Sequence, residues 1–195
     1  MASFDATSGP GVALRGDAVI PRRAPDDAAL VTRARDGSAE AWRALFERHW
    51  DTAYRAAYLI VHDAAAAEDV AQEAFLSALA ALDRFDRRRP FAPWLHRIAV
   101  NRAIDHVRSA ARRRESPGDG SSEAAARPVV EQDGTLLAAI AALGPEQRAV
   151  VVMRYVLDWT PGEIARALKL PRGTVNSRLR RALDRLGEVL KEDLR

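Results

Sequence analysis

Apolar residues recur every three or four positions over most of this 195-residue chain, and no segment shows the alternating pattern of a strand. Such a repeat places the apolar side chains on one face of a helix. It is clear after Ser38, after Asp63, from Pro93 to Arg108 and again from Glu146 onward. The sequence therefore predicts an all-α fold.

Two segments interrupt this pattern. Residues 1–25 are rich in Gly and Pro, and residues 111–134 contain the run ESPGDGSSEAAARP. Pro, Gly, Ser and charge in place of aliphatic residues are typical of flexible arms and linkers. We therefore predict two helical domains, residues 26–110 and 135–195, joined by a flexible linker at 111–134 and preceded by a flexible N-terminal arm at 1–25.

Helix-start signals support this division. Ser38 and Asp63 are placed to cap the helices that follow them, because their short side chains accept hydrogen bonds from unpaired backbone N–H groups. Thr160 and Glu163 form a predicted capping box with Pro161 at the first helical position. Gly144 and Pro145 end one helix and begin the next.

The last two predicted helices form a helix-turn-helix, split at Lys169-Leu170-Pro171. Ile164, Leu168, Val175 and Leu179 supply the facing apolar sides. Lys169 occupies a turn position at which a left-handed residue would cost about 1 kcal/mol, so we expect a slightly rearranged turn.

The second of these helices carries a polar and basic face. Asn and Arg side chains can make paired contacts with base edges in the major groove, while Ser, Thr and further arginines suit phosphates. We predict that it binds duplex DNA through Arg172, Thr174, Asn176, Ser177, Arg178, Arg180 and Arg181.

Charge is also divided along the chain. Residues 26–83 hold eleven acids against five arginines, whereas residues 84–114 hold ten arginines against two acids, although the net charge of the whole chain is only +3. A basic block of this kind is typical of a site for a polyanion, although a solvated basic face gives the same pattern.

Three motifs occur in one order: AEDVAQEAFLSAL, then DRFDRRRPFAPWLHRIAVNRAIDHVR, then EIARALKLPRGTVNSRLRRAL. Together they resemble the bacterial sigma-70 family, and specifically the short extracytoplasmic-function (ECF) group that keeps only regions two and four. The resemblance covers about residues 26–110 and 135–190. It implies a sigma factor that recruits core RNA polymerase to promoters, with region four on the duplex minus-thirty-five element.

The resemblance also implies sites in the first domain. The helix that docks on the beta-prime clamp helices of RNA polymerase is matched by Asp69, Gln72, Glu73 and Phe75, of which Phe75 lies at core spacing. The segment that binds the melted minus-ten element, through cations and planar groups, is matched by Arg84, Phe85, Arg87, Arg88, Arg89, Phe91, His96, Arg97, Asn101 and Arg102. Further implied partners are the polymerase beta flap and an anti-sigma factor.

Three alternatives stay open at this point. A helix-turn-helix repressor or response regulator would bind duplex operator DNA without polymerase, but it would leave the basic block without a role. An enzyme acting on nucleic acid is disfavoured because Glu68, Asp69 and Glu73 have no partnered His or metal-spaced set. An amphipathic membrane binder would need an exposed apolar face that the helix-turn-helix uses for packing.

Composition sets the remaining expectations. The chain has no Cys, which excludes disulfides and thiolate metal sites. It has neither a signal-peptide layout nor an apolar run of the roughly 18 residues that would span a bilayer. We therefore expect a cytoplasmic protein with no membrane insertion, no catalytic activity, no metal and no cofactor.

Overall fold

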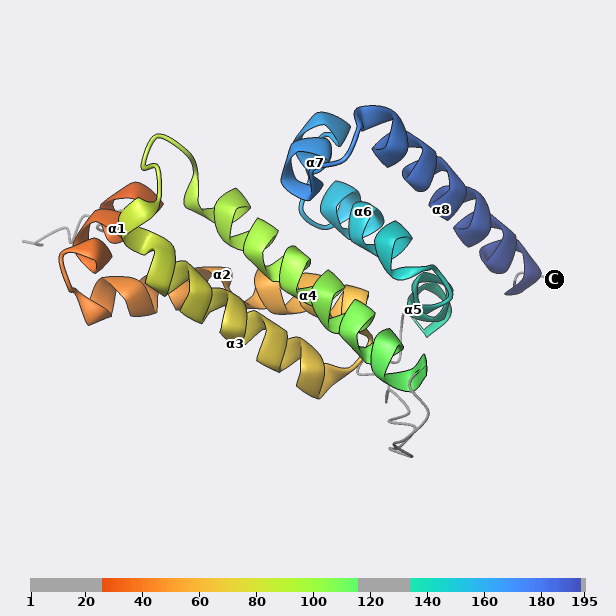
Figure 1. Ribbon diagram of the computed structural model, residues 1–195, viewed down its shortest axis with the longest axis horizontal. Helices are drawn as coiled ribbons and strands as arrows, with labels where there is room; N and C mark the ends of the chain where they lie inside the picture. Colours follow the sequence, from red (N-terminus) through yellow and green to blue (C-terminus); the bar gives the residue numbers. More distant parts are fainter. Residues whose placement is uncertain (1–25, 116–133, 194–195) are drawn as a thin grey trace, which may run out of the picture.

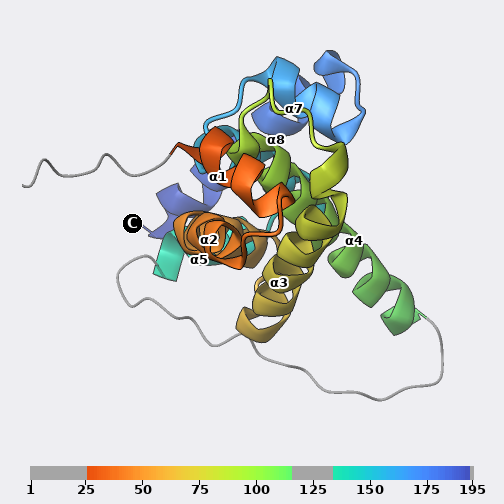
Figure 2. The same cartoon turned by 90° about the vertical axis from the view of Figure 1, so that its left-hand side faces the viewer.

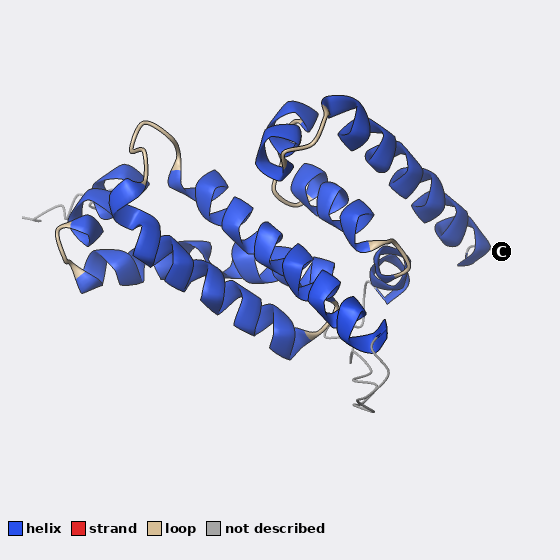
Figure 3. Cartoon of the chain, in the orientation of Figure 1, coloured by secondary structure: helices blue, strands red, loops and turns tan. Residues whose placement is uncertain are grey.

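The computed structural model describes residues 26–115 and 134–193 (Figure 1). Every regular element within these two ranges is a helix (Figure 3), which confirms the predicted all-α fold. The predicted arm at 1–25 and most of the predicted linker lie outside the described residues. The elements are α1 (Asp27–Arg35), α2 (Ala39–Val61), α3 (Ala64–Ala81), the 3-10 turn η1 (Leu82–Arg84), α4 (Phe91–Glu115), α5 (Gly134–Ala141), α6 (Pro145–Tyr155), α7 (Pro161–Leu168) and α8 (Arg172–Asp193).

Local capping sets where the helices begin, as the sequence predicts. The Ser38 hydroxyl accepts the Ala41 N–H at 3.2 Å, and the Asp63 carboxylate accepts the Ala66 N–H at 2.7 Å. At the start of α7, the Thr160 N–H donates to the Glu163 carboxylate at 2.8 Å, and the Glu163 N–H donates back to the Thr160 hydroxyl at 3.3 Å. The predicted capping box is confirmed.

Helices α1 to α4 and η1 form one unit, which we call the N-terminal bundle. Helices α2, α3 and α4 pack against one another, and α1 packs on α2. The Trp42 ring lies edge-on to Phe75 at 6.1 Å and to Phe91 at 6.5 Å between centroids. Such edge-to-face pairs stabilise a core beyond the apolar area that they bury. This bundle has a core of its own around Leu30, Leu45, Phe75, Phe91 and Leu95.

Helices α5 to α8 form the C-terminal bundle, in which α8 packs on α5, α6 and α7. Lys169 joins α7 to α8 in the left-handed conformation, with φ 55° and ψ 42°. The expectation of a rearranged turn is therefore wrong. The Leu170 N–H donates to the Ala165 carbonyl at 2.9 Å, which closes the turn and offsets the cost of about 1 kcal/mol for the left-handed residue.

The two bundles pack against each other. Helices α5 and α6 lie on α2, and α6 also lies on α4 (Figures 1 and 2). One cluster of buried residues continues from Ile60 and Ile104 of the N-terminal bundle to Val150 and Met153 of the C-terminal bundle. Two helical domains joined by a flexible linker were predicted from the sequence, without this shared core.

Candidate nucleic-acid interface

Helix α8 buries one side and presents the other. Val175, Leu179, Ala182 and Leu186 are buried against the C-terminal bundle. Of the predicted duplex-binding residues, Arg172, Asn176, Arg180 and Arg181 are exposed, whereas Thr174, Ser177 and Arg178 are partly buried. The exposed set includes three guanidinium groups and one carboxamide on a single helix, which can form hydrogen bonds with phosphates and base edges.

Internal hydrogen bonds orient part of this face. The Ser177 hydroxyl donates to the Thr174 carbonyl at 3.0 Å, so it is engaged with its own helix. The Arg181 Nε donates to the Ser177 carbonyl at 3.2 Å. Arg172 and Arg180 form no ion pair with any residue in the described ranges, so their charges are available to a ligand.

Arg178 differs from the other arginines of α8. Its side chain is only 21% exposed, and its guanidinium forms an ion pair with Glu146 at the start of α6. The same carboxylate accepts a hydrogen bond from the Arg108 Nη2 of α4 at 2.7 Å. These contacts hold the pKa of Glu146 below its usual range, with the Arg108 hydrogen bond as the largest cause and the charge of Arg178 adding to it.

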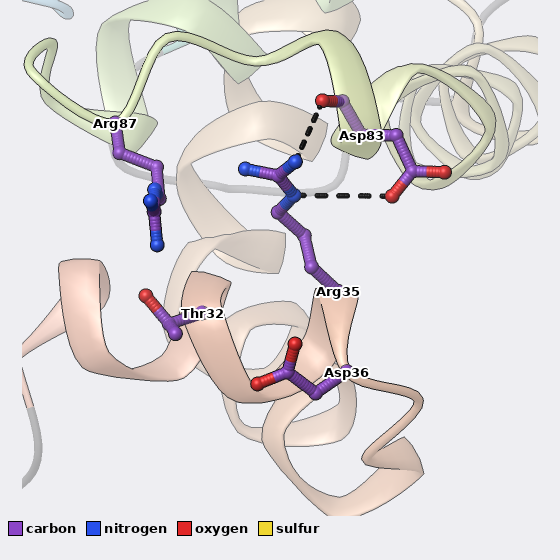
Figure 4. Close-up of a pocket in the computed structure, with 5 residues that line it drawn as sticks. All are labelled: Thr32, Arg35, Asp36, Asp83 and Arg87. Carbon is purple, nitrogen blue, oxygen red and sulfur yellow. Dashed lines mark hydrogen bonds and ion pairs between the residues drawn. The ribbon is translucent and has the colours of Figure 1, made fainter.

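The basic loop before α4 is exposed. Arg84, Arg87, Arg88 and Arg89 all face solvent. The start of this loop is held to α1, because the Arg35 Nη2 donates to the Asp83 carbonyl at 2.9 Å and its Nε lies 3.8 Å from the Asp83 carboxylate (Figure 4). Sequence reasoning missed the role of Arg35, because the contact joins residues 48 positions apart.

The aromatic part of the predicted minus-ten site is buried. Phe91 is 2% exposed, and Phe85 and His96 are also buried in the N-terminal bundle. The Phe85 ring packs on Trp94 with centroids 4.6 Å apart. Rings packed in this way cannot stack on a base in this conformation, so they serve the core. Burial, and to a lesser extent the charge of His49, lowers the pKa of His96 to about 4.

The polar part of that site lies along α4. Asn101 is exposed, and Arg97 and Arg102 are partly buried. All three line an open groove of about 1050 Å³ that is also lined by Arg166 and Lys169 of the C-terminal bundle. Arg102 donates to the Glu73 carboxylate at 2.6 Å and to the Ser77 hydroxyl at 2.6 Å, which fixes its guanidinium against α3.

The predicted polymerase-binding residues divide into two groups on α3. Asp69, Gln72 and Glu73 are exposed, whereas Phe75 is 2% exposed and packs in the core. Leu76, which sequence reasoning missed, is 66% exposed. It follows Asp69, Gln72 and Glu73 at helical spacing, so the four side chains share one face. The available signal was that Leu76 falls outside the apolar period of this helix.

Other kinds of site find no support in the described ranges. No group of three or more His, Asp or Glu side chains there is arranged to hold a metal ion. No helix in those ranges combines the length and apolar character needed to cross a bilayer.

Comparisons with known proteins match both bundles. The family model for sigma-70 region 2 matches residues 45–113, and that for sigma-70 region 4 matches residues 133–186. The chain is 36% identical over 171 residues to the ECF RNA polymerase sigma factor SigL of Mycobacterium tuberculosis (strain H37Rv), covering 84% of this chain and 97% of SigL. It is 28% identical over 183 residues to SigW of Bacillus subtilis, covering 83% of this chain and 95% of SigW.

Two solved structures are similar as well. CnrH in complex with the cytosolic domain of CnrY matches with a TM-score of 0.62 and 29% identity, covering 86% of this chain and 98% of CnrH. The sigma factor RpoE from Bartonella quintana, in complex with the anti-sigma factor NepR, matches in fold with a TM-score of 0.66 and 22% identity, covering 78% of this chain and 98% of RpoE.

A repressor with only a helix-turn-helix, an enzyme or a membrane binder would not match the family models of both region 2 and region 4. Sigma factors bind core RNA polymerase and promoter DNA, and they direct initiation without catalysing a reaction themselves. The chain belongs to the sigma-70 family, as a promoter-directing sigma factor of the ECF group.

Proposed function

We propose that this sigma factor divides promoter recognition between its bundles. Helix α8 binds the duplex minus-thirty-five element, and α4 with its preceding loop binds the melted minus-ten strand. The observation that carries the proposal is the paired arrangement of two separate polar, basic surfaces, one on α8 and one along the loop and α4. Each lies opposite a buried apolar side of its own helix.

On α8, the exposed Asn176 is suited to paired hydrogen bonds with an adenine, and Arg172 or Arg180 to a guanine. Arg181 and Thr174 complete the phosphate-facing side. Ser177 belongs to the same predicted set, and its hydroxyl would have to leave the Thr174 carbonyl to donate to a phosphate. Arg178 belongs to the same predicted set. While it is paired with Glu146, only the exposed 21% of its side chain can contact DNA, and any further contact requires that pair to open.

On the N-terminal bundle, the loop arginines 84 and 87–89 are placed to neutralise phosphates of a single strand. Asn101 offers a carboxamide to an unpaired base, and Arg97 lies one turn before it on α4. Since Phe85, Phe91 and His96 are buried, recognition of the strand rests on polar contacts and charge, with the partly exposed Trp94 as the nearest available ring.

The exposed face of α3 formed by Asp69, Gln72, Glu73 and Leu76 is proposed to dock on the beta-prime clamp helices. Leu76 is the more exposed of two exposed leucines on α3, the other being Leu79, and acidic and amide groups flank it. It is a suitable centre for a protein interface, because apolar anchors there are enclosed by polar contacts. The resemblance to the sigma-70 family further implies that region four, matched by residues 133–186, contacts the polymerase beta flap. Residues 26–110 and 135–195 are the proposed functional domains.

An anti-sigma factor is a further proposed partner, because the similar protein RpoE was solved in complex with the anti-sigma factor NepR, and CnrH was solved in complex with the cytosolic domain of CnrY. Because its partners are core polymerase and promoter DNA, we propose that the protein acts in the cytoplasm.

Run-off transcription with purified core polymerase tests the division of labour. Asn176→Ala and Arg180→Ala should each lower transcription by about tenfold, as expected for losing a base contact worth roughly 1–3 kcal/mol. In these two variants, replacing the minus-thirty-five element should cause little further loss of transcription. Asn101→Ala should show the same behaviour toward the minus-ten element.

Arg185→Ala is the matched control, because Arg185 is an exposed arginine of α8 outside the proposed site. It should leave transcription unchanged. The assignment is wrong if Asn176→Ala and Asn101→Ala become insensitive to the same promoter element, or if Arg185→Ala reduces transcription as much as Arg180→Ala.

A further inference from the structure

We propose that the groove between the start of α4 and helix α7 is a binding site for a nucleoside triphosphate. Its volume of about 740 Å³ lies within the range of small-molecule sites. Trp94 and Arg97 line it from α4, and Arg166 lines it from α7; Figure 1 shows the start of α4 opposite α7. This site goes beyond promoter recognition, because it depends on Arg166, which belongs to none of the promoter contacts proposed above.

Positive charge converges on this groove. Arg89, Arg97 and Arg166 line it, and the last two also line the neighbouring groove that contains Lys169. Neither Arg97 nor Arg166 forms an ion pair with any residue in the described ranges. Like charges that share one space repel one another, so an anion between these guanidinium groups is stabilised by each of them. Phosphate oxygens suit a guanidinium because the two form paired hydrogen bonds.

The two acids of the groove have other partners. The Asp158 carboxylate lies 3.7 Å from the Arg154 Nη1 and is fully exposed. The Glu163 carboxylate accepts from the Thr160 N–H at 2.8 Å and from its hydroxyl at 2.7 Å. These hydrogen bonds are the main reason that the pKa of Glu163 lies below its usual range, and the charge of Arg166 is the smallest cause. The groove therefore keeps positive charge that its own acids do not neutralise.

A fixed aromatic ring adds a second feature. Trp94 packs on Phe85 with ring centroids 4.6 Å apart and on Phe91 at 5.7 Å, and it stays partly exposed. Its indole is thus held in place at the groove, beside the apolar surface of Pro93 and Leu157. Nucleic-acid bases stack on such rings. A base that carries a phosphate chain combines a partner for the ring with a partner for the arginines.

The arrangement of the charges favours a free nucleotide over a DNA strand. The three arginines surround one compact space, with walls from both bundles. A triphosphate places several negative charges within such a space. A DNA strand carries one charge per nucleotide and spreads its phosphates along its length.

Calorimetric titration of the purified full chain tests the site, with GTP as the probe in buffer without Mg²⁺. Inorganic tripolyphosphate supplies the charge alone, and guanosine supplies the ring alone. Because the groove offers partners for both, GTP should bind at least about tenfold more tightly than either. GTP should also quench the tryptophan fluorescence of the parent, and Trp94→Phe should lose most of that quenching.

Arg166→Ala should weaken GTP binding by about tenfold, as expected for the loss of one charge-assisted contact. Arg185→Ala is the matched control, because Arg185 is an exposed arginine of the same bundle that lines neither groove. It should bind GTP as the parent does. Both variants lose one positive charge, so the comparison separates position from net charge. Circular dichroism checks that each variant keeps the helical content of the parent.

Several results would overturn the nucleotide site. They are GTP binding no tighter than tripolyphosphate, equal GTP affinity of Arg166→Ala and Arg185→Ala, and quenching that is unchanged in Trp94→Phe. A single-stranded oligothymidylate that needs Arg166 for binding, while GTP does not bind, would assign the groove to a DNA strand instead.

Promoter binding by the holoenzyme, measured without nucleotides, is a separate readout. Arg166→Ala should match the parent there, because Arg166 lies outside the proposed promoter contacts. A failure of the nucleotide site is thereby distinguished from a failure of the proposed promoter recognition.

Discussion

Burial decides the role of individual aromatic and ionisable residues here. Phe85, Phe91 and His96 lie in a basic segment and carry the planar groups that base stacking requires, yet all three are buried. Their exposure depends on α1, α2 and η1, which pack around them from distant parts of the sequence. Asn101 and Leu76 show the converse case, in which a residue outside the apolar period is exposed.

His96 makes stability depend on pH. Its pKa is lowered from 6.5 to about 4, mainly by burial, so the folded state favours the neutral ring. This stabilisation is fully present above pH 6.5 and is lost as the pH falls toward 4. At about 1.4 kcal/mol per pH unit, the loss is on the order of 3 kcal/mol.

We expect His96→Leu to be less sensitive to acid than the parent. The measurement is the free energy of unfolding in urea at pH 7 and at pH 4.5, where the parent should lose more stability than the variant. His62, whose pKa is also lowered to about 4, adds to the acid sensitivity of both proteins. Equal losses in the parent and in His96→Leu would contradict this account of His96.

At the scale of elements, the local sequence was sufficient to predict where helices begin. It was insufficient to predict the conformation of the turn at Lys169 or the exposure of the side chains on α8. The caps at Ser38, Asp63 and Thr160 were predictable because each involves residues within three positions of one another. The conformation at Lys169 was not, because the Leu170–Ala165 hydrogen bond outweighs the intrinsic preference of a lysine. The seven candidate residues of α8 were chosen by type and spacing, so their division into exposed and partly buried groups needed the structure.

Helix α3 carries the element-scale prediction. Leu76→Lys should weaken binding to core polymerase by about tenfold, which corresponds to roughly 1.4 kcal/mol. The reason is that a charge replaces the apolar centre of the proposed docking face. Since Leu76 is exposed, the free energy of unfolding should change by no more than about 0.5 kcal/mol.

Fluorescence anisotropy with labelled sigma factor and unlabelled core enzyme measures this affinity. Ala39→Lys is the matched control, because Ala39 is exposed at the start of α2 and lies outside α3. The docking face is misassigned if Leu76→Lys binds core polymerase as tightly as Ala39→Lys does.

At the scale of the whole molecule, the two basic surfaces that we propose bind DNA belong to one packed unit. Sequence patterns identified two helical regions, but they carry no information on how regions far apart in sequence pack. The cluster that joins α2 and α4 to α5 and α6 arises from residues that also satisfy the helical period within each region. The packing of the two bundles on each other is thus a property of the full chain.

We propose that α4 and α8 contact different promoter elements in different states of the DNA. The most direct measurement attaches a photo-crosslinker to a single introduced cysteine, at Asn101→Cys or Asn176→Cys, in complexes of polymerase with a promoter that this sigma factor directs. Position 101 should crosslink only to melted minus-ten bases, and position 176 only to the minus-thirty-five duplex. Crosslinks from both positions to the same element, or from position 101 to DNA that is still paired, would contradict the account.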